Sequence, residues 1–199
     1  MKKIVCLFIF LFAGFANAGV ITDLVGDKDC FGLGGSCSDG DHYSTDLGGI
    51  YFTDNRSAGE VLGVDEWDSS FDLDGPTFSF DLDLAGETAL SASIKLFTAG
   101  IDLAAGADFL FNGVLIGSYV EVAGTENMAA TLIFNVPVGL LLNPDTLSLS
   151  LDDAGDGFII DYIELSVVTG STAVPEPSLL ALLGLGLAGI GFSRQKKAA

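Results

Sequence analysis

The chain has 199 residues, of which 27 are acidic and eight basic, and its formal net charge is −19 at pH 7. Between Gly19 and Ala173 the imbalance is greater, because 26 acidic residues are offset by only Lys28, Arg56 and Lys95, which leaves −23. A surface with this much negative charge repels polyanions. Nucleic acid and anionic lipid headgroups are therefore not expected as partners. Divalent cations, neutral sugars or solubility alone remain as reasons for the charge.

The N-terminus has the pattern of a secretory signal peptide. Two lysines follow Met1, an apolar run covers residues 4–15, and Ala16-Asn17-Ala18 places small residues at the positions that a signal peptidase requires. We therefore expect residues 1–18 to be removed on export. The part that follows, residues 19–173, is long enough for one domain with its own core.

The cysteines fit an exported protein. Cys6 lies in the predicted signal peptide, so Cys30 and Cys37 are the only pair left in the mature chain. The six residues between them form a glycine-rich loop, which a disulfide could close in an oxidising compartment. Two thiols and the single His42 are too few ligands for a zinc site of the usual kind. We predict the Cys30–Cys37 disulfide.

Residues 19–173 have the hydrophobic periodicity of strands. Residues 77–84 and 90–96 alternate apolar and polar side chains, with Phe78, Phe80, Leu82, Leu84, Leu90, Ala92, Ile94 and Leu96 expected to point inward. Residues 109–116 read as a hairpin around Asn112-Gly113, a pair that favours a type I′ turn. Further strands are predicted at residues 50–53, 131–136, 146–151 and 158–168.

No segment of ten or more residues in this part has helical periodicity with caps. Eight to ten short strands separated by Gly, Asp and Asn predict an antiparallel β-sandwich of the jelly-roll kind. A short polar linker, residues 169–174, follows the sandwich.

Two loops are rich in the oxygen ligands that calcium prefers. Asp27 and Asp29 alternate in the first loop, as do Asp39 and Asp41, and the second loop, residues 152–157, leads to Asp161. The first and last strands of a jelly roll commonly lie side by side, so we expect Asp27, Asp29 and Asp161 to form a structural calcium site. Alternatively these aspartates cap turns through Asx hydrogen bonds, and Asp161 faces solvent on an edge strand.

The last 26 residues contain three successive features. Val174-Pro175-Glu176-Pro177 is an extended hinge, because neither proline donates a backbone hydrogen bond. An uncharged apolar run at residues 179–192 predicts a membrane helix, and the basic residues Arg194, Lys196 and Lys197 follow it. The run spans only about 21 Å as a helix, so a buried or interfacial helix is the alternative.

This order of motif, apolar span and basic end resembles the PEP-CTERM sorting signal of Gram-negative bacteria. The resemblance implies export, transient anchoring in the inner membrane, and recognition of Val174–Pro177 by an exosortase, a membrane protease. The expected location after processing is the cell surface or the extracellular matrix.

A second resemblance concerns residues 19–173. The Gly26–Gly32 opening, the Phe111–Gly117 hairpin and the Asp156–Leu165 ending are similar to jelly-roll carbohydrate-binding and galactose-binding-like domains. Such domains often hold a structural calcium ion where their ends meet, and the resemblance implies a glycan ligand. For that ligand we expect Trp67 to stack on a sugar ring, with Asp65 and Asp68 accepting hydrogen bonds from hydroxyl groups.

Enzyme signatures are missing from this sequence. It has no Gly-x-Ser-x-Gly motif, no cysteine left as a nucleophile, and only His42 as a base near neutral pH. We predict a non-enzymatic glycan-binding or structural component of the exopolysaccharide matrix. The alternatives are a small calcium-dependent polysaccharide-processing enzyme and a surface-adhesion or ice-binding protein, although the chain has no regular Thr-x-Thr ladder.

Overall fold

A computed structural model describes residues 18–50, 54–66, 76–100, 107–119, 127–151, 158–170 and 184–186. The chain divides into two units, Val20–Thr169 and the terminal segments Met1–Gly19 with Gly170–Ala199. The strands are β1 (Ala18–Gly26), β2 (Thr77–Phe80), β3 (Thr88–Ala99), β4 (Ala107–Phe111), β5 (Val114–Tyr119), β6 (Ala129–Val136), β7 (Asp145–Leu151) and β8 (Ile159–Gly170). A short 3-10 helix, η2 (Val138–Leu140), precedes β7.

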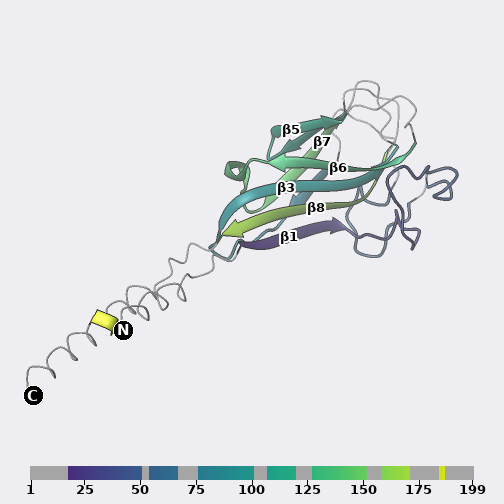
Figure 1. The fold of residues 1–199 in the computed structure, drawn as a ribbon. Helices are drawn as coiled ribbons and strands as arrows, with labels where there is room; N and C mark the ends of the chain where they lie inside the picture. Colours follow the sequence, from purple (N-terminus) through teal and green to yellow (C-terminus); the bar gives the residue numbers. More distant parts are fainter. Residues whose placement is uncertain are drawn as a thin grey trace, which may run out of the picture. The chain divides into compact units, whose positions relative to one another are not determined.

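The strands form two four-stranded sheets with the orders β1-β8-β3-β6 and β2-β7-β4-β5. In Figure 1 the four strands of the first sheet, β1, β8, β3 and β6, lie next to one another in this order. Strand 1 is therefore next to 8, 2 next to 7, 3 next to 6 and 4 next to 5. The same pairing results when one long hairpin is rolled into two sheets, as in a jelly roll. The predicted antiparallel β-sandwich is confirmed at the level of its two sheets.

The main core lies between the sheets and consists of the inward side chains of both. On β2 and just after it, Phe78, Phe80 and Leu82 are buried, as their alternation predicts. Ile94 and Leu96 of β3 meet them from the other sheet. The prediction is wrong for Leu90, which is 59% exposed, because the first four residues of β3 have no partner on β6 and extend beyond the core.

The hairpin predicted around Asn112-Gly113 is confirmed. β4 and β5 pair across it, and both turn residues have positive φ, 49° and 76°, as a type I′ turn requires. The Asn112 side chain also stabilises the neighbouring β7, because its Oδ1 accepts the N–H of Thr146 at 2.8 Å and its Nδ2 donates to the Leu140 carbonyl at 2.8 Å.

The strands of the structure differ from the predicted ones in several places. β1 was not predicted, because only every second residue of 19–26 is partly covered and the apolar alternation is weak. The strand predicted at 77–84 ends at Phe80. Of the strand predicted at 50–53 only Ile50 is described, and it lies outside the named strands.

A second apolar cluster covers the outer face of the β1-β8-β3-β6 sheet. Phe31 from the loop after β1 packs on Phe97 of β3 with ring centroids 5.3 Å apart, and the ring of Tyr162 on β8 stacks with Phe97 at 6.1 Å. The long segment 27–50 is therefore anchored to the sheet by its own buried side chains, among them Leu47 and Ile50.

The side-chain alternation of β8 shifts by one residue near the start of the strand. Phe158 and Ile160 point into the main core, but the next core residue is Ile163. Two consecutive residues, Asp161 and Tyr162, are therefore left outside the main core, as happens at a β-bulge. The shift directs both side chains toward the segment that follows β1.

A glycine at the end of β1 allows the closest approach between the first and last strands. Gly26 has φ +79°, and a Cβ atom there would lie 2.4 Å from the carbonyl oxygen of Asp161. Gly40 has a similar φ of +91°, but a Cβ atom there would meet nothing within 4 Å.

This contrast yields a prediction. Gly26→Ala should lower the free energy of unfolding by about 2–5 kcal/mol, from left-handed strain plus steric overlap. Gly40→Ala should cost only the strain, about 1–2 kcal/mol. Urea unfolding of both variants measures the difference, and equal losses would show that the close approach to β8 is not a constraint.

Candidate functional site

Four aspartates converge where the two ends of the sandwich meet. Asp27 and Asp29 follow β1, Asp161 lies on β8, and Asp65 comes from the segment 54–66. One carboxylate oxygen of each lies within 4.8 Å of the others. The structure thus brings together the three residues that we selected from the sequence and adds Asp65. The alternative for Asp161 is wrong, because it is only 2% exposed and β8 lies between β1 and β3.

Backbone hydrogen bonds hold two of these carboxylates in place. Phe31 donates its N–H to Asp161 Oδ1 at 2.6 Å, and Gly32 donates to Asp29 Oδ1 at 2.7 Å. Cys30 and Phe31 both have positive φ, 70° and 57°, an arrangement in which successive N–H groups turn inward. The loop after β1 therefore wraps around Asp161.

Asp65 is fixed by its backbone. Its N–H donates to the carbonyl of Ile160 on β8 at 2.7 Å, and its φ is 48°. The segment that carries it is tied to the loop after β1, because Asn55 donates its side-chain amide to the Phe31 carbonyl at 3.1 Å. Three stretches far apart in sequence thus meet at one point.

The unpartnered oxygens of the described residues gather at the same place. Among those residues, only Asp27 Oδ1, Glu60 Oε1 and both carboxylate oxygens of Asp65 are buried side-chain N or O atoms with no hydrogen-bond partner. Asp65 is 0% exposed. Unpartnered carboxylate oxygens are costly to bury, so a group that supplies positive charge or protons is required here.

The electrostatics show the same requirement. Burial, followed by repulsion from Asp161 and Glu60, raises the pKa of Asp65 from its usual 3.8 to about 8. Burial also raises the pKa of Asp161 to about 6, although the Phe31 N–H acts in the opposite direction. The pKa of Asp27 is raised by burial and by the neighbouring Asp29.

The donor set suits a hard cation. All four aspartates offer oxygens, the set contains no nitrogen or sulfur, and Glu60 is close enough to repel Asp27 and Asp65. Ca²⁺ takes six to eight oxygen ligands with flexible geometry, whereas zinc in proteins prefers histidine and cysteine. The set could therefore hold calcium, with water or carbonyl oxygens completing the shell.

The sequence missed Glu60 and misassigned Asp65. We expected Asp65 to accept hydrogen bonds from a sugar beside Trp67 and Asp68, but it is buried among the carboxylates, because its backbone is bound to β8. Trp67 and Asp68 lie outside the described residues. Asp39 and Asp41 do not join the cluster: Asp41 accepts the Ser38 N–H at 2.7 Å, the turn-capping role that we gave as the alternative.

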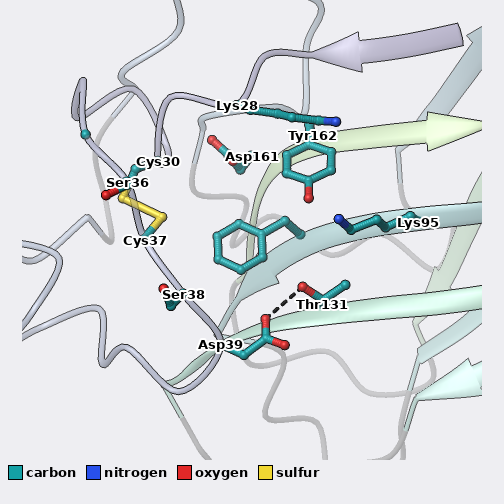
Figure 2. Close-up of a pocket in the computed structure, with 12 residues that line it drawn as sticks. Lys28, Cys30, Ser36, Cys37, Ser38, Asp39, Lys95, Thr131, Asp161 and Tyr162 are labelled. Atoms are coloured by element: carbon teal, nitrogen blue, oxygen red, sulfur yellow. Dashed lines mark hydrogen bonds between the residues drawn. A yellow bond between two sulfur atoms is a disulfide. The ribbon is translucent and has the colours of Figure 1, made fainter. Parts of the chain in front are cut away.

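A pocket adjoins the cluster, with Asp161 in its lining. Its volume is about 520 Å³. Figure 2 shows the loop of the Cys30–Cys37 disulfide on one side and the side chains of Lys95, Thr131 and Tyr162 on the other. The disulfide joins Cα atoms 5.5 Å apart, so the predicted pairing is present.

Two lysines meet at one aromatic ring in this pocket. The Nζ of Lys28 lies 4.8 Å from the centroid of Tyr162, and that of Lys95 lies 5.4 Å from it. Lys28 also forms an ion pair with Glu164. The hydrogen bond with Tyr162 raises the pKa of Lys95. Opposite them, Thr131 donates its hydroxyl to Asp39 at 2.7 Å.

The comparisons with known proteins identify the C-terminal tail. Residues 173–195 match the PEP-CTERM protein-sorting motif, which confirms the resemblance drawn from Val174–Pro177. The motif implies an exported protein that is anchored by its C-terminus and processed by an exosortase. No curated protein matches the chain.

Solved structures that are similar to this chain include two distantly related proteins. A β-porphyranase of glycoside hydrolase family 86 from the human gut bacterium Bacteroides plebeius is 15% identical, with a TM-score of 0.36, over 50% of this chain and 18% of that enzyme. The dimeric latent PorU of Porphyromonas gingivalis is 13% identical, with a TM-score of 0.45, over 79% of this chain and 13% of that protein. This chain therefore corresponds to a small part of either protein.

Residues 1–17 of the predicted signal peptide, the sorting residues Val174–Pro177 and most of the predicted membrane helix lie outside the described residues. Residues 184–186 of that span are helical. Within the described part of the chain, no helix has both the length and the hydropathy needed to cross a bilayer.

The raised pKa values predict how the metal-free protein responds to pH. Between about pH 4 and pH 8 the folded state keeps a proton on Asp65 that the unfolded state releases, so the free energy of unfolding should fall as the pH rises through this range. Asp161 adds to the fall up to about pH 6.

Chemical unfolding in EDTA across this pH range measures the effect. Asp65→Asn should make the slope clearly shallower, because it removes the group with the larger pKa shift. A wild-type slope that is flat, or that the substitution leaves unchanged, would contradict the burial of an ionisable Asp65.

Proposed function

We propose that this protein is a non-enzymatic component of the exopolysaccharide matrix of a Gram-negative bacterium, either glycan-binding or structural, with a structural calcium ion. The PEP-CTERM motif at residues 173–195 supports the location, because it marks an exported protein that an exosortase processes. After release from the inner membrane, the sandwich would act at the cell surface or in the extracellular matrix.

One observation carries the proposal for the sandwich itself. The buried side-chain oxygens without a partner in the described residues belong to Asp27, Glu60 and Asp65. Asp27 and Asp65 belong to the aspartate cluster beside β1 and β8, and Glu60 is close enough to raise the pKa of both. A bound cation would partner them, relieve repulsion in a body of charge −23, and join three segments. Such a site would stabilise the fold and would not be a catalytic centre.

Calcium is the cation that best fits the environment. Extracellular modules bind Ca²⁺ with dissociation constants of about 10⁻⁴–10⁻³ M, and their ligands are carboxylates and carbonyls. Mg²⁺ is smaller, demands octahedral geometry and keeps several waters, which suits a crowded and buried group of carboxylates less well.

A binding or structural role also agrees with the state of the pocket's carboxylates. Asp39 accepts a hydrogen bond from Thr131, and Asp161 accepts one from Phe31 and belongs to the proposed calcium site. Neither is therefore arranged as a free acid or base, and His42 does not line the pocket. The expected result is that bound glycan is not cleaved.

The calcium site predicts a specific thermal response. Melting of the exported protein should shift upward in millimolar calcium relative to EDTA, by about 2.7 kcal/mol of stability when calcium reaches a hundredfold excess over its dissociation constant. Asp65→Asn should abolish most of the shift, because it removes the negative charge of Asp65 and one of that residue's two unpartnered oxygens. Asp83→Asn, which alters an exposed aspartate outside the cluster, should leave the shift intact.

Two results would refute the site. One is a wild-type midpoint that does not respond to calcium. The other is an equal response to magnesium or to sodium at matched ionic strength, which would indicate screening of surface charge.

The sorting motif predicts a separate phenotype. Glu176 is the only carboxylate in the tail, so Glu176→Ala should change C-terminal processing in the native host while leaving the sandwich folded. The intact mass of the protein and its distribution between membrane and matrix fractions report the effect. If both are unchanged, Glu176 is not part of the signal that is read.

The matrix role is tested by co-purification. The exported protein should sediment with the exopolysaccharide of its native host, and incubation should release no shorter sugar products. Turnover would favour the alternative that we derived from the sequence, a small polysaccharide-processing enzyme.

A further inference from the structure

The pocket under the disulfide loop lies on a β-sheet. Its floor is the outer face of the β1-β8-β3-β6 sheet, where Phe97 and Thr131 are direct partners on β3 and β6. Its wall is the loop that the Cys30–Cys37 disulfide closes (Figure 2). The volume of about 520 Å³ falls in the range of small-molecule sites, about 300–1,000 Å³.

The polar groups of this pocket include both donors and acceptors. The ammonium groups of Lys28 and Lys95 can only donate, whereas the carboxylates of Asp39 and Asp161 can only accept when ionised. A ligand that satisfies both kinds must itself carry donors and acceptors close together. Hydroxyl groups do so, because each is one donor and two acceptors.

The pocket also offers apolar surface beside these polar groups. Phe97 and Tyr162 line it with ring centroids 6.1 Å apart, but only 4% and 8% of their surfaces are exposed, so they offer the C–H groups of a sugar a narrow contact rather than an open ring face. Tyr162 also lies within 4.8 Å and 5.4 Å of the two lysine Nζ atoms, which restricts where they can point. The lysines are therefore pre-organised beside the aromatic floor.

The surrounding charge argues against an acidic ligand. Two carboxylates line the pocket, a third belongs to Glu164 and pairs with Lys28, and the aspartate cluster lies directly behind Asp161. The positive charge of the lysines is thus balanced locally, and the body as a whole carries −23. An anion would gain little at the lysines and would be repelled by the remainder.

From these observations we propose that the pocket lined by Lys28, Asp39, Lys95, Phe97, Thr131 and Tyr162 binds a neutral, hydroxyl-rich sugar unit of a glycan. The proposal rests on the glycan-binding form of the function given above and assigns it to residues that the sequence did not indicate. The site expected at Trp67 and Asp68 lies outside the described residues and stays a separate prediction.

The first experiment is a glycan array, probed in millimolar calcium with the exported protein in detergent. The array should carry neutral oligosaccharides and oligosaccharides of the same length that contain uronic acids. We expect binding to neutral glycans, at least tenfold tighter than to their acidic counterparts. Titration with the best neutral oligosaccharide then gives the affinity for each variant.

Two substitutions test the pocket itself. Lys95→Met and Asp39→Asn should each weaken binding about tenfold or more, because each removes a charged hydrogen-bonding partner. Asp108→Asn is the matched control for Asp39→Asn, since Asp108 is also an exposed aspartate that accepts a hydrogen bond from a strand hydroxyl, that of Ser118. The control should bind like the wild type, and all three variants should keep the wild-type melting midpoint within a few degrees.

Each other outcome overturns a defined claim. Neutral binding that survives both substitutions would place the sugar elsewhere and leave the glycan-binding function intact. Tighter binding of uronic acids would overturn the neutral class. An array with no bound glycan would overturn both the pocket and the glycan-binding function, and leave a purely structural role.

Discussion

The meeting of the first and last strands at a group of buried carboxylates is the constraint on which the rest of this structure depends. Asp161 lies near the start of β8 at a buried position, where a charge must have partners, and the loop after β1 supplies one through the N–H of Phe31. Asp65 adds a second buried carboxylate that has no such partner. Like charges this close repel each other strongly in a medium of low dielectric constant. This repulsion therefore acts at the point where three segments of the chain must be joined.

The same loop links this cluster to the pocket. Residues 27–29 contribute two of the aspartates, and the loop that follows, closed by the Cys30–Cys37 disulfide, forms a wall of the pocket. On β8 the shift in alternation places Asp161 and Tyr162 on the same side, one in the cluster and one under the two lysines. A cation in the cluster would therefore also fix the position of the pocket wall, and by thermodynamic linkage a ligand in the pocket would strengthen cation binding.

The sequence predicted what depends on local patterns. Alternation gave most of the strands, the Asn112-Gly113 pair gave the hairpin, and adjacency of the first and last strands led to Asp27, Asp29 and Asp161. It failed for Asp65, because the acidic neighbours in residues 65–68 suggested exposure, whereas a hydrogen bond to Ile160 buries it. Glu60 and the pocket depend on how irregular loops fold over a sheet, and no periodicity records that.

The chemistry of the loop fits the route that the sorting motif implies. A disulfide between Cys30 and Cys37 forms and persists in oxidising compartments, and sites of extracellular modules fill at calcium concentrations of about 10⁻⁴–10⁻³ M. The cytoplasm offers the chain neither an oxidising environment nor calcium at such concentrations. Under this proposal the loop would be closed and its carboxylates neutralised only after export, so the pocket would reach its final form only outside the cytoplasm, where a matrix glycan is present.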